Sequence, residues 1–437
     1  MTDTRTDVLG ELRWRGLVAL STDEAELGEA LSGGQVTYYG GFDPTAASLH
    51  IGNLVLILTL RRLQLAGHRP LALVGGATGL VGDPRPSAER TLNDRDVVAG
   101  WVDRIRAQIE PFLDFDGPSA AVMVNNLDWT APMSAIDFLR DVGKHFRVGR
   151  MLAKEAVSAR LNSEAGISYT EFSYQILQAM DFLELFRRFG CTLQLGGSDQ
   201  WGNLTAGTDL IHRVTGASAH ALATPLITKA DGTKFGKTEG GAVWLDPTMT
   251  SPYAFFQFWV NAEDAKVVEY LKIFTFLHQE RIAELERAVA ERPAARQAQR
   301  ALAHEVTALV HGQQAALRVA EASQALFGRG ELRGLDPVTL ADAVAELPVA
   351  AVDRGDRSVV DLLVASGLVP SRSAARRTIA EGGAYVNNVK VTDEDAVVGP
   401  QDALHDRWLL LRRGRRSLAV ADLGAGTGGV TGATDRA

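Results

Sequence analysis

The chain has 437 residues, of which 46% are hydrophobic and 22% charged, and its formal net charge is -8 at pH 7. This length exceeds one ordinary hydrophobic core, so two or three domains are expected in a soluble globular protein. The negative charge argues against indiscriminate nucleic-acid binding through a global positive field. The single cysteine, Cys191, excludes an intramolecular disulfide and a multi-thiolate zinc site.

The sequence predicts neither an export signal nor a membrane span. Residues 1–7 mix charges and contain no apolar run. Apolar runs such as 54–60 end at Arg61 and are far shorter than the roughly 20 residues that span a bilayer. A cytoplasmic protein is therefore expected, in which Cys191 is a small buried residue rather than a reactive thiol.

The first 250 residues alternate strand-like and helix-like segments, which predicts an α/β fold with a mostly parallel sheet. Ser48 is the predicted N-cap of the first long helix, because serine caps helices well. The expected strands are 36–41, 71–74 and 192–195, and the expected helices are 48–65, 93–112 and 171–189.

From residue 251 the pattern changes. Residues 280–310 are rich in helix-forming Ala, Glu, Arg and Leu, so 251–330 is expected to be a helical domain. Residues 331–356 are expected to be a linker with some helix. Residues 357–422 predict a compact α+β module, with helices at 359–366 and 373–381 and strands at 384–391 and 408–411. The Gly-, Thr- and Ala-rich tail, 423–437, is expected to be disordered.

The first segment that can carry chemistry is 39–53, Tyr-Gly-Gly-Phe-Asp-Pro-Thr-Ala-Ala-Ser-Leu-His-Ile-Gly-Asn. A strand end, a glycine turn and a helix start place backbone N–H groups where an anion can dock. Gly52 has no side chain, so a flat nucleotide base can approach there, and His50 and Asn53 share one helical face. An ordinary capped helix with a surface histidine is the alternative for this segment alone.

The second such segment is the signature loop, residues 228–238, Thr-Lys-Ala-Asp-Gly-Thr-Lys-Phe-Gly-Lys-Thr. Its lysines Lys234 and Lys237 are suited to gripping a polyphosphate as charge develops. The run also resembles the end of a P-loop, but three residues separate Gly232 from Gly236 where a P-loop requires four. A solvated basic loop is the alternative.

Taken together, the two segments resemble the two signatures of class I aminoacyl-tRNA synthetases. Segments 75–84, 174–181 and 194–203 look like those of the tyrosine enzyme, in the family's order, so the resemblance covers roughly residues 35–245. The chain is identified as a member of the bacterial-type tyrosyl-tRNA synthetase family. This implies a Rossmann-like parallel-sheet catalytic domain at 1–250, a helical anticodon-region domain at 251–330 and a small α+β RNA-binding module at 357–422.

The resemblance implies how tyrosine is bound. Its ammonium is expected to meet Asp83, Tyr174 and Gln178, the last two being i,i+4 neighbours on one helix. Its phenol hydroxyl is expected to meet Tyr39 and Asp181 at the bottom of an otherwise apolar pocket. Phenylalanine would then leave Asp181 buried and unpaired, so the site is expected to discriminate strongly against phenylalanine. This family is itself the standard example of such discrimination.

The implied reaction needs no nucleophilic side chain, because the tyrosine carboxylate attacks the α-phosphorus of ATP. Catalysis then rests on positioning and on stabilising the charge that passes to pyrophosphate. The residues expected to act in catalysis are Thr45, His50, Arg90, Lys234 and Lys237. ATP is also expected to contact Asp43, Gly52, Asn53 and Asp199, with Gln200 beside the reacting carboxylate. Mg²⁺ is expected with ATP, without a named protein ligand, and no zinc is expected.

Two positions depart from the family pattern. Asn53 stands where histidine is commoner, and its amide can still donate a hydrogen bond. Segment 83–90 lacks the lysine that many relatives carry in a loop over the phosphates. Arg90 matches the family pattern, whereas a replacement of the lysine by Arg85 is an open alternative.

The C-terminal module supplies local basic surface, since residues 354–418 contain eleven Lys and Arg against eight Asp and Glu. It resembles the α-L RNA-binding module of some ribosomal proteins, and arginines suit phosphate gripping and shape-based RNA readout. A solubilising basic face is the alternative. The expected RNA-binding residues are Arg372, Arg376, Arg377, Arg412 and Arg413. The expected partners are tRNA(Tyr), tyrosine, ATP and a second copy of the chain in a homodimer, with no membrane.

Two other functions are weighed. A tryptophan ligase is disfavoured by Tyr39 with Asp181, because an indole offers only a donor at that end. A catalytically inactive synthetase-like RNA-binding or regulatory protein is disfavoured by the intact His50, Asp83 and both signature-loop lysines.

Overall fold

The computed structural model describes residues 7–84, 92–152, 155–162, 166–233, 235–238, 241–414 and 416–424. The chain divides into two compact units. The first comprises Met1–Met249 with Glu263–Ala298, and the second comprises Thr250–Ala262 with Gln299–Ala437. The stretch 251–330 is therefore divided between the two units, and the finer domain boundaries expected from the sequence stay a prediction.

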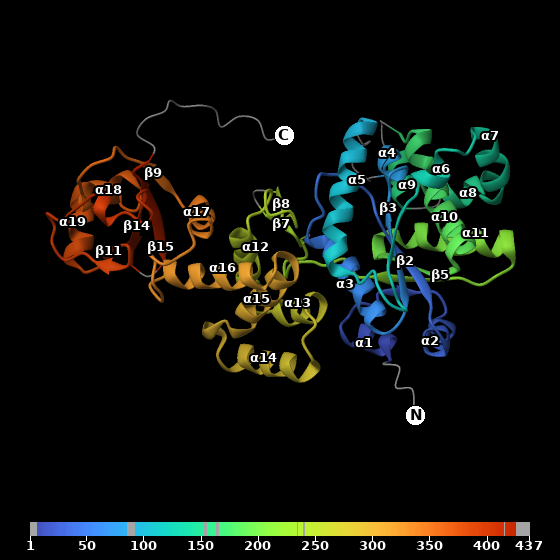
Figure 1. Ribbon diagram of the computed structural model, residues 1–437, viewed down its shortest axis with the longest axis horizontal. Helices are drawn as coiled ribbons and strands as arrows, with labels where there is room; N and C mark the ends of the chain where they lie inside the picture. The colour runs from blue at the N-terminus through green and yellow to red at the C-terminus, as the bar shows by residue number, and fades with distance from the viewer. Residues whose placement is uncertain are drawn as a thin grey trace. The chain divides into compact units, whose positions relative to one another are not determined.

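A six-stranded sheet forms the centre of the first unit (Figure 1). All neighbouring strands are parallel except the first pair, which is antiparallel. The predicted strands and the predicted α/β parallel-sheet fold are thus confirmed. The strand order is β1 (Leu20–Ser21), β6 (His220–Thr224), β5 (Cys191–Gly197), β2 (Thr37–Phe42), β3 (Arg69–Val74) and β4 (Val122–Asn125).

Helices cover both faces of this sheet (Figure 1). Successive strand side chains point to opposite faces, and β2 illustrates this. The hydroxyl of Tyr38 donates to the carbonyl of Leu60 on α3 at 2.5 Å, whereas the ring of Tyr39 lies 5.3 Å from that of Phe182 on α10. The helices are α1 (Val8–Trp14), α2 (Glu24–Gly33), α3 (Ile51–Leu65), α4 (Thr78–Val81), α5 (Arg95–Ile109), α6 (Leu127–Thr130), α7 (Ala135–Asp137), α8 (Val148–Leu152), α9 (Glu155–Leu161), α10 (Tyr169–Phe189), α11 (Trp201–Thr215), α13 (Val267–Phe274) and α14 (Gln279–Glu291).

The second unit combines helices with a separate five-stranded sheet. The helices are α12 (Pro252–Val260), α15 (Gln297–His311, which starts in the first unit), α16 (Gln313–Leu326), α17 (Pro337–Ala345), α18 (Val359–Ala365) and α19 (Arg372–Ala380). The sheet order is β12 (Val389–Lys390), β11 (Ala384–Val386), β14 (Trp408–Arg413), β15 (Ser417–Asp422) and β9 (Val349–Ala351), and β10 (Arg357–Ser358) pairs separately with β13 (Val397–Val398). The segment expected as a linker, 331–356, thus contains α17 and β9.

One core supports this module. Apolar side chains of α18 and α19 pack with those of β11 and β14, including Leu363, Ile379, Ala384 and Leu409. The helices and the strand at 408–411 predicted for the α+β module are confirmed. The single strand predicted at 384–391 is wrong, because Asn387 and Asn388, both with positive φ, turn the chain between the antiparallel strands β11 and β12. In the described part of the chain, no helix is long and apolar enough to cross a membrane.

Candidate active site

The carboxyl ends of β2 and β5 lie side by side where the strand order reverses. In open α/β sheets, ligands bind at such a switch point. β2 runs into Asp43, and β5 runs into the 3-10 turn η4 (Ser198–Gln200). The turn after β3 leads through α4 to Asp83. The topology therefore brings residues that are far apart in the sequence to one edge of the sheet.

The helix α3 begins at this edge, and His50 is its N-cap. The Nδ1 atom of His50 accepts a hydrogen bond from the N–H of Gly52 at 3.0 Å, and Asn53 Oδ1 accepts one from the N–H of His50 at 3.1 Å. The prediction that Ser48 is the N-cap is wrong, because a backbone bridge to Trp244 keeps the chain extended as far as His50. A Cβ on Gly52 would lie 2.9 Å from His50 Nδ1, so a residue larger than glycine at this position would displace the His50 ring.

The signature loop lies against the start of α3. At Gly236, φ is +86°, and a Cβ there would lie 2.8 Å from Ile51 Cγ1. The carbonyl of Gly236 accepts a hydrogen bond from Val243, whose own carbonyl accepts one from the N–H of Ile51, both at 3.0 Å. After Gly236 the loop enters β7 (Lys237–Thr238), which pairs with β8 (Gly241–Ala242). The two signature segments, nearly 200 residues apart in the sequence, thus meet in space.

The two residues expected at the tyrosine phenol are close together and buried. Tyr39 is 2% exposed, and its hydroxyl has no hydrogen-bond partner among the described residues. Burial raises the pKa of Tyr39 well above its ordinary value, and the nearby Asp181 raises it further. The site therefore holds a buried hydroxyl that a ligand would satisfy.

Asp181 accepts hydrogen bonds from two neighbouring side chains. Its Oδ1 accepts a hydrogen bond from Trp129 Nε1 at 2.8 Å and its Oδ2 accepts one from Asn126 Nδ2 at 2.9 Å. Burial raises the pKa of Asp181 to about 7, although both hydrogen bonds lower it. The expectation that Asp181 is unpaired without a phenol is wrong, because these two side chains already satisfy its carboxylate. The unsatisfied group is the Tyr39 hydroxyl.

A chain of hydrogen bonds runs from Asp181 to Tyr174. Asn126 Nδ2 also approaches Thr78 Oγ1 at 2.9 Å, and the Thr78 hydroxyl donates to Asp43 Oδ1 at 2.7 Å. The hydroxyl of Tyr174 donates to Asp43 Oδ2 at 2.6 Å. Such networks hold their members in one arrangement, because breaking any link leaves a buried polar group unpaired. These hydrogen bonds thereby connect Asp43 to Tyr174 and Asp181, which are predicted to bind tyrosine.

The residues expected at the ammonium and carboxylate of tyrosine lie next to this chain. Asp83 Oδ2 accepts a hydrogen bond from Gln200 Nε2 at 2.9 Å. Asp83 Oδ1 and Gln200 Oε1 also accept from Asn203 Nδ2, at 3.3 and 2.8 Å. Burial, with Asp43 and then Asp83, raises the pKa of Tyr174 well above its ordinary value. The Oε1 atom of Gln178 is buried without a hydrogen-bond partner in the described ranges.

The other predicted residues of this region divide into two groups. Thr45, His50 and Asp199 are exposed at the same edge of the sheet. Arg85, Arg90 and Lys234 lie outside the described residues, and of Lys237 only the backbone is described.

The arginines expected to bind RNA lie on two elements of the second unit. Arg372 starts α19 and forms an ion pair with Asp361, while the exposed Arg376 and Arg377 follow one turn later. On β14, Arg413 donates to a backbone carbonyl, and the guanidinium of Arg412 lies 3.8 Å from the centre of the Tyr385 ring. These arginines thus come from a helix and a strand of one small core.

Two family models match the chain. The model of class I tRNA synthetases for tryptophan and tyrosine matches residues 31–328, and that of the SYY-like C-terminal domain of tyrosine–tRNA ligases matches residues 339–421. The chain is 67% identical over 422 residues to a tyrosine–tRNA ligase of Streptomyces avermitilis, which covers 96% of this chain and 100% of that protein. The chain belongs to the tyrosine–tRNA ligase family.

Further relatives agree with this placement. A tyrosine–tRNA ligase of Kineococcus radiotolerans is 67% identical over 94% of this chain and 98% of that protein. Among solved structures, a C-terminally truncated mitochondrial tyrosyl-tRNA synthetase of Coccidioides posadasii is 32% identical, with a TM-score of 0.65 over 72% of this chain and 92% of that one. A tryptophanyl-tRNA synthetase of Encephalitozoon cuniculi, 14% identical with a TM-score of 0.55, shares the fold.

Asn126 and Trp129, which donate to Asp181, and Thr78, which donates to Asp43, were not predicted from the sequence. One signal was available for Asn126, because it directly follows Asn125, the last residue of β4, and so lies at the carboxyl edge of a parallel sheet. Trp129 and Thr78 lie on short helices after β4 and β3, and the side chains they reach cannot be read from spacing alone.

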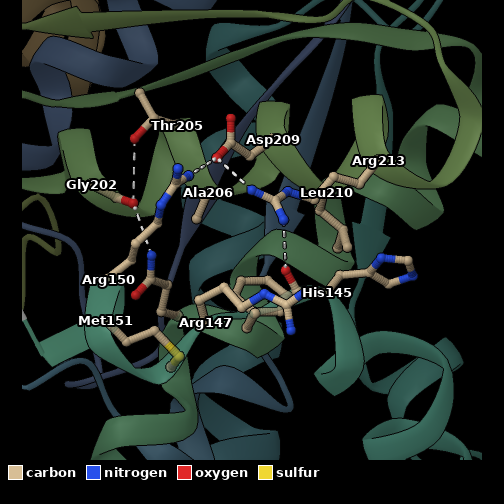
Figure 2. Close-up of a pocket in the computed structure, with 12 residues that line it drawn as sticks. His145, Arg147, Arg150, Met151, Gly202, Thr205, Ala206, Asp209, Leu210 and Arg213 are labelled. Atoms are coloured by element: carbon tan, nitrogen blue, oxygen red, sulfur yellow. Dashed lines mark hydrogen bonds and ion pairs between the residues drawn. The ribbon is translucent and has the colours of Figure 1, made fainter.

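A pocket of about 240 Å³, which was not predicted from the sequence, lies between α10, α11 and the segment around α8 (Figure 2). Figure 2 shows Asp209 between Arg150 and Arg213, with nitrogen–oxygen separations of 3.6 and 3.9 Å. None of the residues predicted to bind tyrosine or ATP lines this pocket.

Proposed function

We propose that this chain performs the tyrosine–tRNA ligase reaction of its family in two steps. ATP activates tyrosine to tyrosyl-adenylate and pyrophosphate, and tyrosine then passes to the 3′ end of tRNA(Tyr). The observation that carries the proposal is the meeting of both signature segments at the sheet edge where Tyr39 and Asp181 are buried. The catalytically inactive alternative has no support in the family matches.

The tyrosine phenol is bound by Tyr39 and Asp181. Its hydroxyl supplies the missing partner of the Tyr39 hydroxyl and donates to a free lone pair of the Asp181 carboxylate. The orphaned Oε1 of Gln178 accepts from the tyrosine ammonium, together with Asp83 and Tyr174. The bonds to Asn126 and Trp129 hold the Asp181 carboxylate in place for this contact.

ATP binds over the start of α3. Backbone N–H groups at a helix start favour an anion, and the phosphates lie near Thr45 and His50. Gly52, Asn53, Asp199 and Asp43 contact the adenosine side, while Gln200 lies at the tyrosine carboxylate. The signature-loop lysines and Arg90 stabilise the charge on pyrophosphate as the carboxylate attacks. Mg²⁺ accompanies ATP through phosphate oxygens, and neither a protein ligand for it nor zinc is proposed.

The macromolecular partners are tRNA(Tyr) and a second copy of the chain. The tRNA is bound in part by the arginines of α19 and β14. Exposed apolar side chains between residues 127 and 169 support a homodimer through the first unit, because such surface commonly marks an interface. They include Ile136, Leu139, Val148, Leu161 and Tyr169. A cytoplasmic location follows from the role in translation.

Charging of a tRNA(Tyr) transcript with radiolabelled tyrosine tests the full reaction. The expected result is ATP-dependent transfer of label to the tRNA, and none to a tRNA(Phe) transcript. A preparation that makes tyrosyl-adenylate but leaves both tRNAs uncharged would contradict the second step.

A further inference from the structure

The helix α13 touches the beginning and the middle of the signature loop. The hydroxyl of Tyr270 donates to the carbonyl of Thr228 at 2.9 Å. The ring of Phe235, the residue after Lys234, lies 4.5 Å from the ring of Tyr270 and 5.6 Å from that of Phe274. Tyr270 and Phe274 are buried. One helix face thus makes a polar and an aromatic contact with the loop.

The far end of the loop is attached to α3 instead. The hydrogen bonds from Gly236 through Val243 to Ile51, described above, tie the loop to the first turn of α3. The chain leaves the sheet after Thr224, the last residue of β6, enters the loop at Thr228, turns at Gly232 with φ +80°, and reaches α3 at Gly236. At its upstream end the hydroxyl of Tyr270 holds the carbonyl of Thr228, and backbone hydrogen bonds from the N–H of Lys229 to the carbonyl of Thr233 and from the N–H of Phe235 to the carbonyl of Ile227 join the two limbs of the loop.

The carboxyl end of α13, the helix that carries Tyr270, is itself hydrogen-bonded to α3. Arg62, on the last turn of α3, donates to the carbonyls of Ile273 and Thr275 at 2.9 and 2.7 Å. Arg15 donates to the carbonyls of Lys272 and Thr275 at 2.8 and 3.0 Å. Burial lowers the pKa of Arg62 to about 9. These arginines cap the carboxyl end of α13, where cations are favourable.

We propose that Tyr270 is a positioning residue for the activation step. By holding the carbonyl of Thr228 and the ring of Phe235, it sets the path of the loop that carries Lys234 and Lys237 relative to the start of α3. This proposal rests on the proposed function of those lysines at pyrophosphate. Positioned charges contribute most in the transition state, so Tyr270 acts on kcat more than on substrate binding.

The variant Tyr270→Phe isolates the hydroxyl, since it keeps the ring against Phe235. We expect kcat of tyrosine-dependent ATP–pyrophosphate exchange to fall roughly three- to tenfold, as for loss of one hydrogen bond, while KM for tyrosine is unchanged. The matched control is Tyr38→Phe, which removes another buried hydroxyl bonded to a backbone carbonyl, that of Leu60 on α3. It is expected to lower Tm without lowering kcat.

A second variant and a second readout make the result decisive. Phe235→Leu removes the aromatic contact from the loop side and is expected to lower kcat in the same way. Hydrogen exchange of residues 228–238 is expected to be faster in Tyr270→Phe than in the wild type and unchanged in Tyr38→Phe. This second readout needs no activity, so it tests the anchor even if the wild type shows no exchange reaction and the proposed function fails.

Two results would overturn the positioning role. One is a Tyr270→Phe variant with wild-type kcat and unchanged hydrogen exchange in the loop. The other is a loss of kcat matched by the Tyr38→Phe control in proportion to its loss of Tm, which would assign Tyr270 a purely structural part.

Discussion

At the scale of single residues, the tyrosine end of the site separates a satisfied carboxylate from an unsatisfied hydroxyl. Asp181 receives hydrogen bonds from Asn126 and Trp129, whereas the Tyr39 hydroxyl is buried without a partner in the described chain. A buried unpaired hydroxyl costs about 1 to 3 kcal/mol. The unliganded chain therefore carries a destabilising group that a ligand with a polar end relieves.

Tyr39→Phe is accordingly expected to have opposite effects on stability and on binding. Removing the unpaired hydroxyl should leave the unliganded chain as stable as the wild type or more stable by about 1 kcal/mol. KM for tyrosine should rise about tenfold, and discrimination against phenylalanine should fall. Thermal denaturation and pyrophosphate exchange with both amino acids measure these effects. A variant that loses stability while its KM for tyrosine is unchanged would contradict this account.

The raised pKa of Asp181 predicts a pH dependence of stability. Between about pH 4, the ordinary pKa of aspartate, and about pH 7, the folded chain holds a proton that the unfolded chain has released. The contribution of this group to the free energy of unfolding is therefore largest at the acidic end and falls as pH rises, by roughly 1 kcal/mol per pH unit.

Urea unfolding of the wild type and of Asp181→Asn, at several pH values from 4.5 to 7.5, measures this dependence. The difference in the free energy of unfolding should shift in favour of the wild type as pH falls. A difference that is constant across this range, or that shifts the other way, would mean that Asp181 is ionised in the folded chain.

At the scale of elements, the start of α3 is the most constrained segment of the site. His50 caps the helix with its ring, Asn53 completes the cap, and Gly52 leaves the ring room. The sequence predicted the helix, and glycine and polar residues at a strand-to-helix turn are the local signals on which its ligand-binding residues stay a prediction. It did not predict the cap, because the extended pairing of His50 with Trp244 is a contact between residues nearly 200 positions apart.

Gly52→Ala tests this constraint. The added Cβ would lie within 2.9 Å of the His50 ring and should displace it, so KM for ATP should rise and kcat should fall at least tenfold. Alanine favours a helix over glycine by about 1 kcal/mol, so stability should change little. The control is Gly100→Ala on the exposed side of α5, where a Cβ meets nothing within 4 Å. It should stabilise the chain without changing exchange, and equal kinetics of the two variants would contradict the role of Gly52.

At the scale of the whole molecule, the proposed binding sites are divided between two compact units. The first unit holds the residues proposed to bind tyrosine and ATP, and the second holds the arginines of α19 and β14 that are proposed to bind RNA. Motif order and periodicity were sufficient to predict the α/β fold and most of the elements. Motif order and periodicity did not predict that residues 263–298 pack with the first unit, because this packing depends on buried contacts such as those of Arg62 with backbone carbonyls at the end of α13.

Replacement of Arg376 and Arg377 by alanine tests the division of work. Both side chains are exposed on α19, so little stability should be lost. Loss of phosphate contacts should raise KM for tRNA(Tyr) about tenfold and reduce the salt dependence of charging, while exchange without tRNA keeps its wild-type rate. A parallel loss of exchange would show that the second unit takes part in activation.

The central claim is that this chain activates tyrosine in particular, and tRNA-free ATP–pyrophosphate exchange with tyrosine, phenylalanine and tryptophan tests it most directly. The account predicts exchange with tyrosine and only weak exchange with phenylalanine or tryptophan, because neither brings a hydroxyl to Tyr39 and Asp181. Exchange with none of the three, or equal exchange with tyrosine and phenylalanine, would contradict it.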